Sequence, residues 1–263
     1  MEGSMQQNLI KEKLIEYYTN YYRNVLSLPD WHSRVTERLS EEDLESKKIK
    51  RIEKMIGNFK GKILLNVGCG TGGFNIEAFK KGAKIFAIEP EKDAIFIARL
   101  KADKFGINKK NIVNGVAEKI PFRDNQFDIV YCFSVVEHVN NLHRSLKEMI
   151  RVCKKGGKIY IETRDYRGFY EGHYKMFWLP LFPKKIAAIY LKIRKRNPDY
   201  LFNGIRYVTL PEIENLLKKT DKNIKIINYS TSPSKLKGAI NFLIYYYLKL
   251  LQINPNIELI IQK

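Results

Sequence analysis

The chain has 263 residues, enough for one large domain with insertions. Hydrophobic residues make up 44% of it and charged residues 29%, as in a soluble globular protein. The opening residues lack the basic start, apolar core and small-residue cleavage site of a secretory leader. The three cysteines, Cys69, Cys132 and Cys153, are odd in number and have no CxxC spacing, which argues against a disulfide or zinc framework. These features predict a cytoplasmic protein that holds no metal.

The formal net charge of +19 is unevenly distributed. Residues 164–263 carry 18 basic and 7 acidic groups, whereas residues 1–60 carry 11 and 10. Such a surface favours an anionic partner, which could be a nucleic acid, a membrane surface, or an acidic small molecule or glycan. A composition rich in Lys explains the charge equally well, so charge alone does not select a partner.

Two helices are expected before the first strand. Residues 5–28 have the pattern of an amphipathic helix rich in Tyr that ends near Pro29. Ser40 and Asp43 resemble a capping box at the start of a second helix, which runs to about Ile56 and is ended by Gly57. Residues 1–59 are therefore expected to form an amino-terminal helical cap ahead of a domain over 60–263.

From residue 62 onward, short apolar strands alternate with helices. The expected strands are 62–67, 84–88, 111–114, 127–132 and 158–162, and the helices between them cover 74–81, 93–105 and 142–153. This alternation favours a parallel sheet with helices on both faces and right-handed connections. Ligands of such sheets bind beyond the carboxyl ends of the strands, where the strand order reverses.

The alternation breaks after the fifth strand. Residues 164–208 form a long insertion rich in aromatic and basic residues, which we expect to act as a substrate lid. Thr209 then caps a helix, and 224–229 and 257–262 are expected to be closing strands. The apolar helix expected between them, over 235–251, is too short and interrupted to span a membrane. The predicted fold class is α/β, with a doubly wound, seven-stranded, mostly parallel sheet.

A glycine-rich turn follows the first strand and opens the next helix. Gly68, Gly70 and Gly72 allow a tight turn and a close approach of the backbone to a ligand, and the helix start offers unpaired N–H groups. Glu89, at the end of the second strand, is placed to accept hydrogen bonds from the ribose hydroxyls of an adenosine. NAD enzymes use both features, and Gly73 satisfies their G-x-G-x-x-G spacing, so the turn alone does not identify the cofactor.

The wider pattern resembles the class I S-adenosylmethionine-dependent methyltransferases. Residues 64–72 resemble motif I of that family, 115–122 its loop after strand three, 125–139 its strand four and following turn, and 146–157 the helix and glycine pair before strand five. The resemblance covers 60–163 and is to the group that includes small-molecule methyltransferases of quinone, lipid and sugar metabolism. It implies a Rossmann-like sheet, S-adenosylmethionine as cofactor, and a small-molecule, lipid-linked or saccharide acceptor.

The resemblance also assigns roles to residues. The glycine turn would pack against the methionine portion, Glu89 would bind the ribose, and Ser134 would line the floor of the cofactor site. Asn66 and Val116 stand where the family often has Asp, and Glu118 is a candidate replacement for the second lost acceptor. The implied cofactor-binding residues are Asn66, Gly68, Cys69, Gly70, Gly72, Glu89, Pro90, Ala117, Glu118 and Ser134.

Methyl transfer requires a nucleophile aligned with the sulfonium carbon and shielded from water, and a hydroxyl nucleophile benefits from a base. The candidate bases are His138, after the fourth strand, and His173, in the insertion, because imidazole titrates near neutral pH. A structural hydrogen bond or ordinary packing explains either residue as well. We expect O-methylation by a protein that is cytoplasmic or peripheral at a membrane. An RNA methyltransferase, a non-catalytic cofactor-binding or membrane-associated scaffold, and an NAD oxidoreductase are the alternatives.

Overall fold

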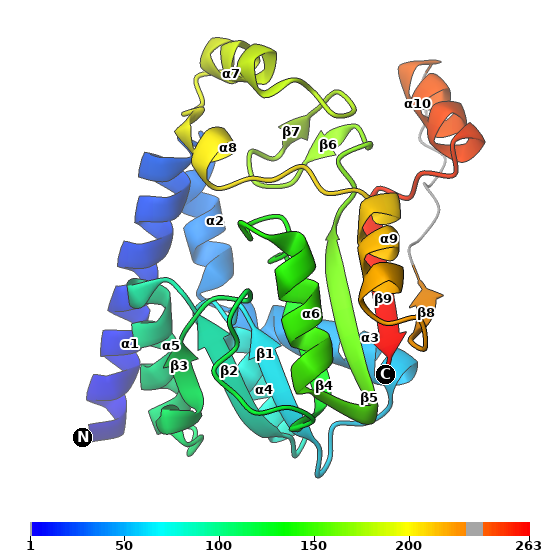
Figure 1. Ribbon diagram of the computed structural model, residues 1–263. Helices are drawn as coiled ribbons and strands as arrows, with labels where there is room; N and C mark the ends of the chain where they lie inside the picture. Colours follow the sequence, from blue (N-terminus) through cyan, green and yellow to red (C-terminus); the bar gives the residue numbers. More distant parts are fainter. Residues whose placement is uncertain (1, 230–238) are drawn as a thin grey trace.

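The computed structural model describes residues 2–229 and 239–263, with side chains described for 5–229 and 242–263. Within these ranges a seven-stranded sheet has the order β3-β2-β1-β4-β5-β9-β8 (Figure 1). Its strands are β1 (Ile63–Val67), β2 (Lys84–Glu89), β3 (Ile112–Asn114), β4 (Phe127–Phe133), β5 (Cys153–Arg164), β8 (Lys225–Asn228) and β9 (Asn256–Gln262). Strands β1 to β5 pair in parallel, and β9 is antiparallel to both β5 and β8. The predicted α/β fold with a mostly parallel sheet is confirmed.

Helices cover both faces of the sheet (Figure 1). One face packs against α3 (Glu41–Ile56), α4 (Gly73–Lys80) and α5 (Lys92–Lys104), and the other packs against α6 (Leu142–Val152) and α9 (Leu210–Thr220). The central strands are apolar at nearly every position because both of their faces are buried. The strand order reverses beside β1, which leaves a crevice at the carboxyl ends of β1 and β4.

The amino-terminal cap and the insertion share one hydrophobic core. The cap comprises α1 (Glu2–Thr19), a π-helical segment η1 (Asn20–Val25) and α2 (Trp31–Arg38). The insertion contains the hairpin β6 (Tyr170–Glu171) and β7 (Met176–Phe177), followed by α7 (Lys184–Ile193) and α8 (Asp199–Asn203). Leu14 and Leu26 of the cap pack in one cluster with Tyr174 and Trp178 of the insertion, and all four are buried. These two segments, far apart in sequence, therefore pack together, and both line the cavity at the carboxyl edge of the sheet.

Several local expectations differ from the structure. The capping box at Ser40 is wrong: Ser40 precedes α3, but its hydroxyl donates to the Glu37 carbonyl and caps nothing, because its backbone is not in the extended conformation that an N-cap requires. Helix α2 was not expected. Thr209 does cap α9, accepting a hydrogen bond from the Glu212 N–H.

The carboxy-terminal helix is α10 (Ala239–Leu250). It lies within the expected range of 235–251, of which residues 235–238 are outside the described part of the chain. None of the helices over 2–229 and 239–263 combines the length and apolar character needed to cross a bilayer.

Candidate active site

A cavity of about 610 Å³ lies at the carboxyl ends of β1 and β4. It is lined by the cap, by the strand ends and by the insertion, so that all three parts of the chain contribute to one site. The strand-end residues Asn66, Gly68, Cys69, Gly70 and Ser134 line it, together with Glu137, His138, Thr163 and His173.

The glycine turn presents open backbone to this cavity. Gly68, Gly70 and Gly72 all have positive φ, of 69°, 52° and 86°, which side-chain-bearing residues rarely adopt. A Cβ on Gly68 would lie 2.4 Å from Cγ2 of Val135, whereas a Cβ on Gly70 would have no neighbour within 4 Å. The turn is therefore packed against the protein at Gly68 and unobstructed at Gly70.

Glu89, at the end of β2, reaches back to the glycine turn. Its Oε2 accepts a hydrogen bond of 2.8 Å from the Gly70 N–H, and its Oε1 accepts one of 3.0 Å from the Glu91 N–H. Burial raises the pKa of the Glu89 carboxyl, and the two N–H donors oppose that shift. Each carboxylate oxygen has a second lone pair, so Glu89 can still accept hydrogen bonds from two hydroxyl groups.

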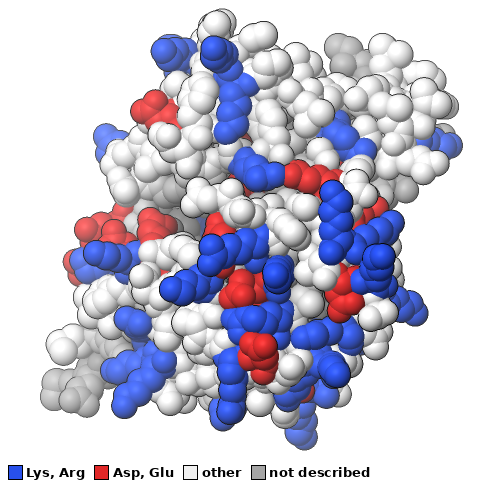
Figure 2. Space-filling model, in the orientation of Figure 1, with Lys and Arg blue, Asp and Glu red and all other residues white. Residues whose placement is uncertain are grey.

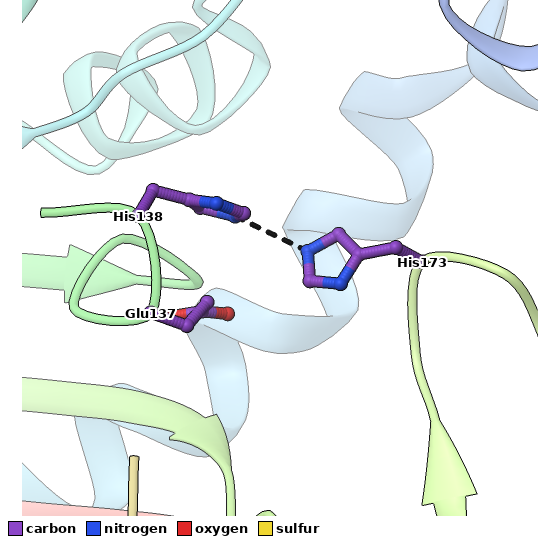
Figure 3. Close-up of side chains that lie close together, drawn as sticks. All are labelled: Glu137, His138 and His173. Carbon is purple, nitrogen blue, oxygen red and sulfur yellow. Dashed lines mark hydrogen bonds between the residues drawn. The ribbon is translucent and has the colours of Figure 1, made fainter. Parts of the chain in front are cut away.

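The two candidate bases meet although 35 residues separate them: the Nε2 atoms of His138 and His173 are 3.1 Å apart (Figure 3). Nδ1 of His138 lies against the Gly204 carbonyl oxygen, and Nδ1 of His173 is 2.7 Å from Oε1 of Glu171. Because a carbonyl and a carboxylate only accept, both Nδ1 atoms donate. Burial lowers the pKa of His138. Burial also opposes the charged form of His173, but Glu171 holds the pKa of that ring above its usual value.

Glu137 lies beside this pair and was not among the predicted site residues. Its carboxylate points toward the two rings (Figure 3), and one ligand atom from each of Glu137, His138 and His173 lies within 4.8 Å of the others. The residue is 1% exposed, and its Oε2 accepts a hydrogen bond of 2.8 Å from the Thr163 hydroxyl. The only hint in the sequence was its position next to His138 after a buried strand.

Comparison with known proteins identifies the family. The profile of the methyltransferase domain family matches residues 65–161, which run from β1 through β5. Residues 65–161 are therefore a methyltransferase domain of the class I S-adenosylmethionine-dependent kind. The cofactor of this domain is accordingly S-adenosylmethionine and not NAD.

Individual relatives are similar over about half of this chain. A demethylmenaquinone methyltransferase of Oceanobacillus iheyensis is 34% identical over 139 residues, which are 49% of this chain and 58% of that protein. A ubiquinone biosynthesis O-methyltransferase of Pseudomonas fluorescens is 27% identical over 136 residues, 51% of this chain and 57% of that one. The chain thus matches less than two thirds of the length of either relative. A solved S-adenosylmethionine-dependent methyltransferase from Thermotoga maritima shares the fold, with a TM-score of 0.52 at 20% identity over 89% of this chain and 100% of that one.

The predicted cofactor-binding residues of this methyltransferase fall into two groups. Asn66, Gly68, Cys69, Gly70 and Ser134 line the cavity, whereas Gly72, Glu89, Pro90, Ala117 and Glu118 are outside its lining. Ala117 is buried in the core, and Pro90 is exposed. Oε1 of Glu118 accepts hydrogen bonds from the N–H groups of Asn140 and Asn141, so this carboxylate anchors the segment before α6. Asn66 donates to the Asn75 side chain at 2.8 Å, which fixes its orientation.

Sequence reasoning missed a buried network behind the glycine turn. Glu41, at the start of α3, accepts hydrogen bonds from the hydroxyls of Thr71 and Tyr18. It also forms an ion pair with Lys101. Of these, Tyr18, Glu41 and Thr71 line the cavity. In the sequence Glu41 has the pattern of an ordinary acidic residue in a first helical turn, so no local signal marked it.

Proposed function

We propose that this methyltransferase transfers the methyl group of S-adenosylmethionine to an oxygen of a small-molecule, lipid-linked or saccharide acceptor. The observation that supports this most strongly is the single cavity of about 610 Å³ shared by the glycine turn and the His138–His173 pair. A cavity of this size is in the range that holds a cofactor or drug-sized ligand. A methyl donor at the turn and an acceptor at the imidazoles would then meet inside one cavity, which aligns the two reactants.

On the cofactor side, the unobstructed backbone at Gly70 receives the methionine portion, beside Asn66 and Ser134. Glu89 accepts the ribose hydroxyls with its two remaining lone pairs. The family resemblance would place the adenine beyond the lining of the cavity, toward Pro90, Ala117 and Glu118. Tyr17 of α1 donates a hydrogen bond of 2.7 Å to Glu91, so the cap covers the protein next to this end of the cofactor.

On the acceptor side, His138 and His173 activate the attacking hydroxyl. Their Nδ1 atoms are held by Gly204 and Glu171, which directs both Nε2 atoms away from those partners and toward each other. The fixed orientation suits a catalytic role, since an acceptor must be aligned to a fraction of an ångström. The name of the Pseudomonas fluorescens relative, an O-methyltransferase, also supports transfer to oxygen.

The insertion over 164–208 acts as the substrate lid in this proposal, within a methyltransferase domain over 60–263 that is capped by 1–59. Arg164, Gly172, His173 and Lys175 of the insertion line the cavity, so it contributes directly to the acceptor site. Because the insertion shares its core with the cap, we expect the two to order together around a bound acceptor.

A lipid-linked acceptor is supported by the surface of α7. Ile186, Ile189 and Ile193 are 55%, 61% and 73% exposed, and their spacing puts them on one face of the helix. Lys185 and Lys192 flank that stripe and are exposed. Exposed apolar residues beside lysines are the pattern of a helix that lies on an anionic membrane surface. We therefore propose that α7 holds the enzyme at the membrane peripherally.

On the face drawn in Figure 2 the basic residues are dispersed. Lys and Arg side chains are spread over the surface there, with acidic side chains among them. Within the described residues, nothing beyond net charge favours RNA as the acceptor over a small molecule.

The proposal is tested with S-adenosylmethionine carrying a labelled methyl group and a panel of phenolic, quinol, lipid-linked and saccharide acceptors. We expect labelled product on at least one acceptor, and a lower kcat for His138→Ala and His173→Ala at unchanged affinity for S-adenosylhomocysteine. His143→Ala, an exposed histidine on α6, is the control. Cofactor binding with no product on any acceptor would support a scaffold instead, and label in RNA alone would support an RNA methyltransferase.

A further inference from the structure

We propose that Glu137, His138 and His173 bind a divalent first-row transition-metal ion, and that this ion binds the acceptor oxygen. The metal site is inferred from the geometry of these residues alone. Only the role of the ion in acceptor activation rests on the proposed function.

The first argument is the orientation of the two imidazoles. Both Nδ1 atoms donate to oxygen acceptors, so in a neutral ring each Nε2 carries a lone pair. Two lone pairs that face each other at 3.1 Å repel unless a proton or a metal ion lies between them. With metal–imidazole bonds of about 2.0–2.1 Å, nitrogens at this separation give an N–metal–N angle of about 100°, between the octahedral and tetrahedral values.

The second argument is the set of groups that hold the rings. Metal-binding histidines usually donate their other N–H to a carboxylate or a backbone carbonyl, which fixes the tautomer and makes the ligating nitrogen more basic. His173 donates to the carboxylate of Glu171, and His138 to the Gly204 carbonyl. Glu171 is itself fully buried and accepts hydrogen bonds from the Tyr166 hydroxyl and the Tyr174 N–H. The rings are thus oriented before any ligand arrives.

The third argument is the buried carboxylate of Glu137. At 1% exposure it has no ion pair with Lys or Arg among the residues that the structure describes, and one hydroxyl, that of Thr163, donates to it. Burial of a carboxylate is costly unless a cation or a metal ion compensates its charge. Its ligand atom lies within 4.8 Å of both imidazole ligand atoms, so the three groups converge on one place to which an ion would draw them.

The three residues also face a cavity and leave coordination positions of the ion open, as a catalytic metal site requires. Glu137, His138 and His173 all line the cavity that reaches the glycine turn. Three protein ligands leave coordination positions open for water or an acceptor. Imidazole and carboxylate ligands suit ions such as Zn²⁺, Fe²⁺ or Ni²⁺.

The chemistry balances without a further reactant. A hydroxyl bound to the ion loses its proton to water near neutral pH, because the ion lowers its pKa. The resulting oxyanion forms the O–CH₃ bond as the S–CH₃ bond breaks, and the sulfonium leaves as a neutral sulfide. No oxidant or reductant is needed.

The test uses the full chain without an affinity tag, stripped of metal with a chelator and titrated with Co²⁺ as a spectroscopic probe. We expect one Co²⁺ per chain by visible absorption and calorimetry. His138→Ala, His173→Ala and Glu137→Gln should each weaken binding by at least about tenfold, and Glu171→Gln by about 10- to 100-fold because it releases the His173 ring. His143→Ala, which removes an exposed histidine outside the site, should bind Co²⁺ like the wild type.

Two outcomes would overturn the inference. One is a wild-type chain that takes up less than one equivalent of Co²⁺, which needs no variant to fold. The other is equal binding of Co²⁺ by the wild type and by a folded His138→Ala/His173→Ala double variant. That result would mean that the two rings of the wild type share a proton and bind no metal ion. Binding of S-adenosylhomocysteine to the metal-free chain is measured in parallel. If S-adenosylhomocysteine does not bind while Co²⁺ does, the proposed function is wrong but the metal site stands.

Discussion

The carboxylate of Glu41 lies 2.6 Å from the ammonium of Lys101, and the two residues are 3% and 1% exposed. This pair joins the start of α3 to α5 across 60 residues of sequence. Because Glu41 also accepts the Thr71 hydroxyl, the same carboxylate fixes the back of the glycine turn. Tyr18 of the cap donates to the same carboxylate, so the cap is connected to the glycine turn through one buried charge.

Removing one member of this pair should destabilise the protein strongly. Lys101→Ala leaves Glu41 buried without its closest cation, and such changes cost about 3–5 kcal/mol of unfolding free energy. The measurement is unfolding in denaturant followed by circular dichroism. Lys13→Ala breaks an exposed pair with Glu16 and should leave the transition unchanged. A loss below about 1 kcal/mol for Lys101→Ala would mean that water solvates the Glu41 carboxylate.

The same pair predicts a loss of stability in acid. Burial alone would raise the pKa of Glu41, but Lys101, Thr71 and Tyr18 hold it below its ordinary value of 4.5. A carboxylate with a depressed folded-state pKa adds stability that is fully present above the unfolded value and is lost as pH falls through the folded one. Melting temperatures measured from neutral pH to well below 4.5 should therefore fall. The melting temperature of Glu41→Gln should decline less steeply over that pH range. Parallel curves for the variant and the wild type would mean that Glu41 does not cause the loss of stability in acid.

A side chain at Gly70 should block the cofactor without unfolding the domain. Gly70 and Gly106 both have positive φ, of 52° and 73°, and neither has a neighbour within 4 Å of an added Cβ. The backbone strain of Gly70→Arg and Gly106→Arg is thus similar, whereas only Gly70 lines the cavity. Calorimetry with S-adenosylhomocysteine should show lost binding for Gly70→Arg alone. Equal affinities in the two variants would remove the turn from the cofactor site.

Glu89→Gln should weaken cofactor binding by about 10- to 100-fold, because hydrogen bonds to a charged acceptor contribute about 1.5–3 kcal/mol. Burial raises the pKa of Glu89. The affinity of the wild type for the cofactor should therefore fall as pH is lowered, and the fall should begin above the ordinary carboxyl pKa of 4.5. Glu77→Gln, a change at a buried carboxylate of α4 that pairs with Lys80, is the control and should bind normally. If Glu89→Gln bound the cofactor with wild-type affinity, the Glu89 carboxylate would only stabilise the glycine turn through the Gly70 N–H and would not bind the ribose.

The α7 surface should bind anionic membranes. Ile189→Asp/Ile193→Asp should abolish sedimentation with phosphatidylserine vesicles, since each change places a charge on the apolar stripe. Melting temperature should not change, because both side chains are exposed. Phe96→Asp, at another exposed apolar residue, should sediment like the wild type. Equal sedimentation of all three proteins would place the contact elsewhere.

The layered sheet was predictable because its signals are local. Buried strands such as β1 and β2 have short apolar runs, and Thr209 marks a helix start with its own side chain. The capping box failed where two local hydrogen bonds compete: the Ser40 hydroxyl donates to the Glu37 carbonyl in the preceding turn and does not cap α3.

By itself, the sequence determined the alternating strands and helices over 62–162, the glycine turn and Glu89, because each depends on residues within one strand–turn–helix unit. The cofactor family followed from the wider resemblance over 60–163. Only the tertiary structure decided that His138 meets His173 and Glu137, and that Glu41 meets Lys101. Those contacts depend on how the cap and the insertion pack over the sheet. That packing is set by the summed burial of many apolar side chains, and no single spacing in the chain records it.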